Sequence, residues 1–160
     1  MSWIPVLSTV VGAVIGLGSG LLTEHLRAGR EHTGQSLSAR RDVYVQYLAA
    51  LHDANEALRA VSLGEHAPDL TRKSAARVAF RSARITQARE HVILLAPEPV
   101  ITAADNAYRS LRTLRDRIGQ GEQLAQYEPA LMAYGDSLDE LRQAVRHDLG
   151  INGRSPRIEL

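Results

Sequence analysis

Apolar residues recur at helical spacing along most of the chain from residue 35 onward. The first such stretch carries two rows of apolar residues, and both rows fall on one helix face because side chains three and four positions apart are neighbours. These residues are Tyr44, Leu51 and Leu58 in one row and Tyr47, Ala54 and Val61 in the other. The pattern stops near Gly64, and residues 64–69, which include Pro68, indicate a loop.

A second periodic stretch covers residues 70 to 95. Its core-facing row is expected to consist of Val78, Ile85 and Val92, which lie seven apart in one continuous helix. Pro97-Glu98-Pro99 follows, and proline both lacks a backbone N–H and restricts the residue before it. The second helix is therefore predicted to end at about Leu95.

Two further helices are predicted after this proline pair. The third carries the apolar row Val100, Ala104, Ala107, Leu111, Leu114 and Ile118, and Gly119 and Gly121 close it. The fourth is expected to begin around Pro129, a residue favoured in a first helical turn, and to end at Gly150. Its apolar positions are Leu131, Tyr134, Leu138, Leu141 and Val145. Four helices joined by short breaks predict an all-α, antiparallel up-down four-helix bundle over residues 35–150, followed by a polar tail at 151–160.

The first part of the chain has a different pattern. Residues 3–22 contain no charged side chain, and a helix of that length extends about 30 Å, the thickness of the hydrocarbon core of a bilayer. A cleaved signal peptide and a buried soluble helix are the alternatives, but no Lys or Arg precedes the apolar run as a signal peptide would require. We expect residues 1–23 to form a transmembrane helix.

The residues after this run indicate its orientation. Arg27, Arg30, Arg40 and Arg41 follow the apolar run and no Lys or Arg precedes it, so the positive-inside rule predicts a single-pass protein of the cell membrane with its N-terminus outside and the bundle in the cytoplasm. Residues 24–34 form a juxtamembrane connector. It is either a hinge at its two glycines or, as we favour from its helix-forming composition, a mostly continuous helix.

Three glycines within the apolar run lie four residues apart. Gly12, Gly16 and Gly20 fall on one helix face, where the lack of a Cβ allows another helix backbone to approach closely. The pattern predicts self-association or docking on another membrane helix. Glycine is also common in membrane helices without any such role, and that alternative stays open.

Composition excludes several chemistries. The chain has no Cys, which rules out disulfides, thiolate catalysis and cysteine-ligated metal centres, and its net charge of +1 gives no general attraction to nucleic acid. None of its six His lies three or four residues from another, and no Glu-x-x-His metal motif, phosphate-binding glycine loop or nucleophile motif occurs. We predict no catalytic residue, no metal, no cofactor and no small-molecule substrate, and hence a protein that is not an enzyme.

Two short segments carry a resemblance to known proteins. Residues 40–48, RRDVYVQYL, and residues 146–150, RHDLG, resemble those of small actinobacterial single-pass membrane proteins with a cytoplasmic helical bundle. The preponderance of Arg over Lys, with Lys73 the sole Lys, is typical of a GC-rich bacterial genome. The resemblance implies the same architecture and supplies no activity.

The second predicted helix carries an unusual concentration of positive charge. Lys73, Arg77, Arg81 and Arg84 share one helix face, with Arg72 and Arg89 nearby. Acids on neighbouring helices, such as Glu56, Asp105 or Asp116, could neutralise this stripe. Alternatively the stripe binds an acidic partner, anionic lipid or nucleic acid, and nucleic acid ranks last because no aromatic side chains for base stacking accompany it.

These observations predict a membrane-anchored interaction or scaffold module that binds a protein partner and self-associates through its glycine face. The alternative function is binding of anionic lipid or nucleic acid through the basic stripe.

The glycine face can be tested by substitution. Gly16→Ile places a branched side chain in the centre of the proposed contact, where packing depends on close backbone approach, so the dimer signal in a transmembrane association assay should fall. Val14→Ile lies off that face and should leave the signal unchanged. Equal signals from the two variants would assign the glycines to ordinary membrane composition.

Overall fold

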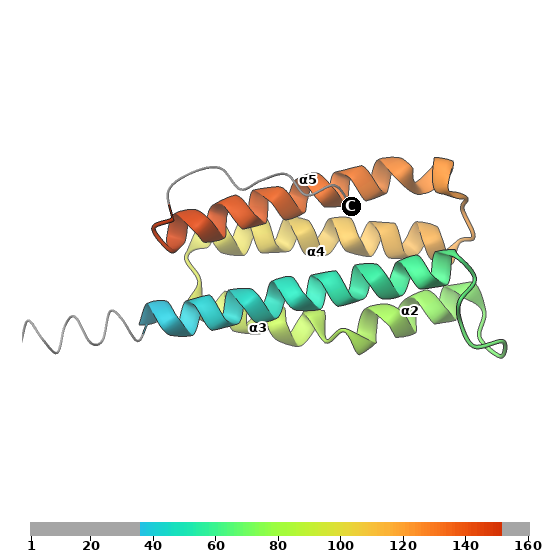
Figure 1. Cartoon of the computed structure of the whole chain (residues 1–160), viewed down its shortest axis with the longest axis horizontal. Helices are drawn as coiled ribbons and strands as arrows, with labels where there is room; N and C mark the ends of the chain where they lie inside the picture. The colour runs from blue at the N-terminus through green and yellow to red at the C-terminus, as the bar shows by residue number, and fades with distance from the viewer. Residues whose placement is uncertain (1–35, 152–160) are drawn as a thin grey trace, which may run out of the picture. The chain divides into compact units, whose positions relative to one another are not determined.

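The computed structural model describes residues 36–151, and these residues are all-α, without a strand (Figure 1). The helices are residues 36–62, α2 (Arg72–Ser82), α3 (Ile85–Leu95), α4 (Glu98–Gly119) and α5 (Leu124–Asp148). The predicted anchor at 1–23, its Gly12, Gly16 and Gly20, the connector at 24–34 and the tail beyond Ile151 lie outside the described residues. Within 36–151, no helix is both long and apolar enough to cross a bilayer.

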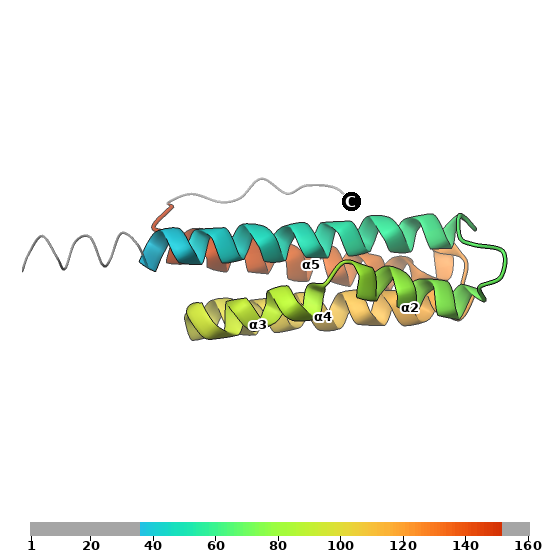
Figure 2. The ribbon, with the colours of Figure 1, turned by 90° about the horizontal axis from the view of Figure 1, so that it is seen from below.

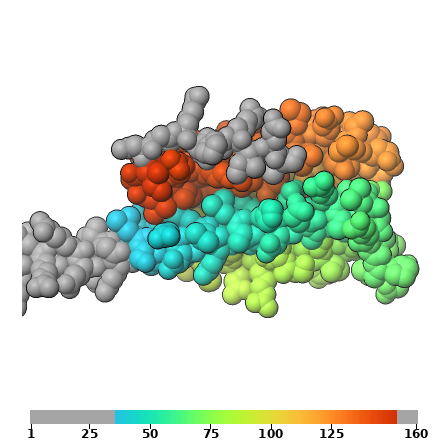
Figure 3. Space-filling model, viewed as in Figure 1, coloured from blue at the N-terminus to red at the C-terminus, as the bar shows by residue number. Residues whose placement is uncertain are grey.

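Four helical rods run alternately up and down, and the second rod consists of α2 followed by α3 (Figures 1 and 2). The 36–62 helix and α5 are antiparallel, since Tyr44 near the start of one bonds to Asp148 at the end of the other. α4 packs against α2, α3 and α5. In the space-filling view, the loop after residue 62 projects from the end opposite to residue 36 (Figure 3). The bundle and its up-down order therefore agree with the prediction.

The predicted apolar rows form most of the core. All six residues named on the 36–62 helix and all six on α4 are buried, as are Ile85, Val92, Tyr134, Leu138, Leu141 and Val145. Leu131, which was expected in the same row of α5, is only half-buried. Heptad spacing thus identified most of the packing face of each continuous helix.

The prediction of one continuous second helix was wrong. α2 ends at Ser82 and α3 begins at Ile85, and between them Arg84 has a φ of +52°, in the left-handed region that non-glycine residues seldom occupy. Phe80 and Ile85 are both buried, yet five positions in an unbroken helix turn the side chain by about 140°. The break lets both face the core. Val78, which the register of one continuous helix placed in the core, is instead exposed.

The predicted start of the last helix was also wrong. α5 begins at Leu124, five residues before Pro129. Gln123 and Gln126 form a capping box, in which the backbone N–H of Gln123 donates to Oε1 of Gln126 at 2.7 Å. The additional turn buries Tyr127, which offsets the backbone hydrogen bond that Pro129 cannot donate.

The hydroxyls of three core tyrosines connect the rods. The hydroxyl of Tyr47 donates to the carbonyl of Ala104 at 2.9 Å, and that of Tyr134 donates to the carbonyl of Leu51 at 3.3 Å. The hydroxyl of Tyr44 donates to Oδ2 of Asp148 at 2.6 Å. Burial raises the pKa of all three tyrosines well above the ordinary value of 10.0, and the charge of Asp148 raises that of Tyr44 further.

Leu138 tests the packing of α5. Leu138→Ala removes buried apolar volume and should lower the free energy of unfolding by about 2–5 kcal/mol, measured by thermal unfolding of a chain that starts at residue 24. Glu140 is exposed on the same helix, so Glu140→Ala should change stability by less than about 0.5 kcal/mol. Asp139 is unsuitable as the control because it pairs with Arg142. A fully stable Leu138→Ala variant would contradict the packing described for α5.

The buried tyrosines predict a loss of stability in alkali. Above pH 10 an unfolded tyrosine loses its proton while the folded one, with its raised pKa, keeps it. The folded state then holds more protons, so the free energy of unfolding falls with rising pH, by up to about 1.4 kcal/mol per pH unit for each tyrosine. A Tyr47→Phe/Tyr134→Phe variant should show a shallower decline in urea unfolding between about pH 9 and about pH 11. Equal slopes for parent and variant would contradict the prediction.

Candidate functional site

Three of the four predicted stripe residues stay together on the surface of α2. Thr71 caps the start of this helix by accepting a hydrogen bond from the backbone N–H of Ser74 at 3.2 Å. Lys73, Arg77 and Arg81 then follow at intervals of one turn, and all three are exposed. None of them takes part in an ion pair within residues 36–151. We call these three residues the α2 basic face.

The acids expected to neutralise the stripe are engaged elsewhere. Asp105 on α4 pairs with Arg89 at 2.6 Å and with Arg109 at 3.5 Å. Asp116 pairs with its neighbour Arg115 at 2.6 Å. Glu56 is exposed on the 36–62 helix and forms no ion pair with the α2 basic face in the described part of the chain. Among the described residues, therefore, no acidic side chain neutralises the α2 basic face.

Two nearby cations have structural roles. Nη2 of Arg72 donates to the carbonyl of Ser62 at 2.6 Å, which satisfies one of the free carbonyls at the end of the 36–62 helix. Arg89 pairs with Asp105 and lies over the ring of Tyr108, 5.4 Å from its centroid. Burial alone would lower the pKa of Arg89, but the hydrogen bond and the charge of Asp105 more than compensate and raise it. Both residues hold rods together and are unavailable to a partner.

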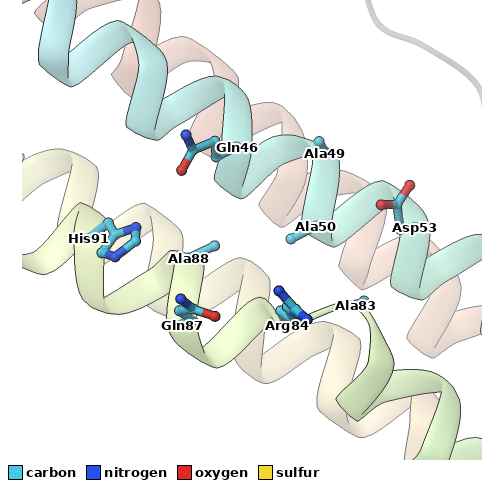
Figure 4. Close-up of a pocket in the computed structure, with 9 residues that line it drawn as sticks. All are labelled: Gln46, Ala49, Ala50, Asp53, Ala83, Arg84, Gln87, Ala88 and His91. Atoms are coloured by element: carbon cyan, nitrogen blue, oxygen red, sulfur yellow. The ribbon is translucent and has the colours of Figure 1, made fainter.

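Arg84 leaves the stripe because the helix breaks before it. It lines a groove of about 330 Å³ between the 36–62 helix and α3 (Figure 4). Alanines from both sides create the space, and polar side chains rim it: the lining is Gln46, Ala49, Ala50, Asp53, Ala83, Arg84, Gln87, Ala88 and His91. Apolar periodicity does not reveal this groove, and the one sequence signal for it is the clustering of alanines on two helices. The rim offers hydrogen-bonding groups but no hydrogen-bonded nucleophile and base.

Residues 40–48 and 146–150, on which the expected resemblance was based, lie next to each other in the bundle. Asp148 at the end of α5 accepts a hydrogen bond from Nη1 of Arg40 at 2.9 Å and one from the hydroxyl of Tyr44 at 2.6 Å. All three side chains are largely shielded, with side-chain exposures of 24% for Arg40 and 11% for Asp148. These contacts join the 36–62 helix to α5 at one end of the bundle. Spacing along the sequence could not reveal this structural role.

The described residues offer no metal site. No three His, Asp or Glu side chains in residues 36–151 come together in a geometry that could hold an ion. His52, His91 and His147 are exposed, and Nδ1 of the half-buried His66 lies 3.1 Å from the carbonyl oxygen of Ala67. In this part of the chain, the α2 basic face brings three exposed cations without an ion pair onto one helix face.

Comparison with known proteins adds no relative to this description: no protein-family model, no curated protein and no solved structure matches the chain.

Proposed function

We propose that the chain is a single-pass, membrane-anchored interaction module that binds an acidic protein partner through the α2 basic face. The observation that carries the proposal is the row of Lys73, Arg77 and Arg81, exposed and without an ion pair in the described residues. Three like charges on one face repel each other and destabilise the helix slightly unless a partner of opposite charge is bound. An unpaired row of this kind is suited to recognition of carboxylates.

The position of α2 in the bundle favours a protein over lipid. The 36–62 helix extends about 40 Å, and α2 follows the loop at its far end (Figure 1). The proposed anchor joins the bundle at residue 36, the end opposite to the start of α2, so this connection alone does not bring the α2 basic face to the bilayer. Electrostatic attraction to headgroups decays within about 8 Å at physiological salt. Nucleic acid ranks lower still, since Phe80, the sole aromatic residue of α2, is buried and cannot stack on bases.

The membrane part of the proposal rests on the uncharged residues 3–22. The arginines that follow this run favour a bundle in the cytoplasm. Gly12, Gly16 and Gly20 would pair the anchor with a second copy, which would present two basic faces to a partner and increase its effective affinity. The proposal assigns no catalytic residue and no cofactor.

Topology is the first test. The full chain should remain with membranes after carbonate extraction, and a chain from residue 24 onward should be soluble and helical, because the apolar run is its sole membrane-spanning element in this proposal. A reporter fused after Leu160 should report the cytoplasm. Release of the full chain by carbonate would contradict the anchor, and activity of an exported alkaline-phosphatase fusion would contradict the orientation.

The α2 basic face is the second test. Arg77→Glu/Arg81→Glu should reduce the amount of the bound partner recovered with the detergent-extracted chain by at least about tenfold, since reversing two contacting charges costs more than 1.4 kcal/mol. Recovery with the parent chain should also fall as salt is raised.

A matched control reverses two exposed arginines on other helices. Arg59→Glu/Arg112→Glu changes the net charge equally but leaves α2 intact, so recovery of the partner should stay at the parental level. A partner lost equally from both variants would show general charge attraction. Equally tight binding of the soluble bundle to protein-free anionic vesicles would favour the lipid alternative.

A further inference from the structure

Three consecutive apolar side chains are exposed where α3 ends. Ile93, Leu94 and Leu95 have exposed fractions of 37%, 77% and 46%, whereas Val92 before them is buried. Successive residues of a helix point about 100° apart, so one face of α3 can cover only part of this run. The other large apolar residues exposed in the described chain occur singly along the sequence. We call Ile93, Leu94 and Leu95 the α3 tip.

The α3 tip lies at a defined end of the bundle. α3 runs toward this end, and α4 starts back from it after the Ala96-Pro97 turn (Figures 1 and 2). The 36–62 helix begins here and α5 finishes here, as the contact between Arg40 and Asp148 shows. The tip is therefore at the end of the bundle where the chain enters from residue 35.

The length of the preceding chain restricts what can cover the tip. Residues 23–35 separate the uncharged run from the 36–62 helix. These thirteen residues extend about 20 Å as a helix and at most about 45 Å when fully extended. If the run spans a bilayer, the end of the bundle that carries the α3 tip can reach the membrane surface when the connector bends at its two glycines, whereas a continuous helix would hold that end about 20 Å away.

We propose that the α3 tip inserts into the interface of the bilayer that holds the anchor. The inference rests on the proposed function, because it requires residues 3–22 to span that bilayer. Three apolar side chains at a helix end can enter the boundary between headgroups and acyl chains. Glu90 and Glu98 are exposed on either side of the tip and restrict insertion to this shallow depth.

The proposed anchor explains how a contact of only three side chains can keep the α3 tip on the bilayer. Three side chains bury too little apolar surface to hold a free protein on a membrane, but the anchor makes the contact intramolecular and raises its effective concentration. The anchor and the tip are then two points of attachment.

The absence of Cys allows a direct test on the full chain. Leu94→Cys and, as the matched control, Leu63→Cys are labelled with the same environment-sensitive fluorophore and reconstituted into vesicles of phosphatidylcholine and phosphatidylglycerol. Leu63 is 68% exposed, similar to Leu94, but lies at the opposite end of the bundle. Lipids with a nitroxide on the upper acyl chain should quench the label at residue 94 at least about twofold more than the label at residue 63. Unchanged thermal unfolding of both variants verifies that the bundle is intact.

Each other outcome overturns a defined part of the inference. If the chain floats with the vesicles but the two labels are quenched equally, the α3 tip does not contact lipid and the proposed anchor still stands. If the label at residue 94 is protected from aqueous iodide but not quenched by the nitroxide lipid, a protein surface such as a second copy covers the tip. If the full chain does not float with the vesicles, the proposed anchor fails and the insertion of the tip fails with it.

Discussion

The bundle depends on one constraint: tyrosine hydroxyls buried among hydrocarbon must find acceptors. An unsatisfied hydroxyl in such a core costs far more than the net gain from a formed hydrogen bond. The hydroxyl of Tyr47 reaches a carbonyl of α4, and that of Tyr134 reaches a carbonyl of the 36–62 helix. Leucine and alanine rows tolerate several sliding registers at similar free energy. The two tyrosines tolerate only those registers in which both carbonyls stand opposite, so they set the axial position of three rods.

The break at Arg84 gives the second rod two different surfaces. In the half before the break, cations face solvent without an ion pair in the described residues; in the half after it, Arg89 is joined to α4 and the helix finishes in exposed leucines. A left-handed non-glycine residue carries a cost of about 1 kcal/mol or more, which the burial of both Phe80 and Ile85 offsets. The break thus separates a cationic surface from an apolar one on a single rod.

Sequence periodicity predicted the number of rods, their order and most of the core, because heptad spacing directly reports which side chains share a helix face. It failed where the reason was not periodic. A left-handed Arg84 leaves no sequence signature of the kind that glycine provides, so the break and the exposure of Val78 were missed. The start of α5 was predicted from Pro129 alone, whereas the capping box is formed by Gln123 and Gln126. Contacts such as Asp148 with Arg40 and Tyr44 join residues more than a hundred positions apart, which spacing within a helix cannot predict.

Of the predicted basic stripe, the exposure of Lys73, Arg77 and Arg81 followed from the sequence. The departure of Arg84 from the stripe did not, because it depends on the break in the helix.

An even number of rods brings residues 36 and 151 to the same end of the bundle, next to the cluster of Arg40 and Asp148. A label or fusion at either boundary therefore occupies the same side, where it crowds whatever the chain carries before residue 36. The loop between residue 62 and α2 lies at the other extremity, and its Gly64 has a φ of +86° with open space around it. Insertion into this loop adds only a slowly growing loop-closure entropy. For imaging or immobilising the bundle without obstructing its N-terminal side, this loop is the site that the topology recommends.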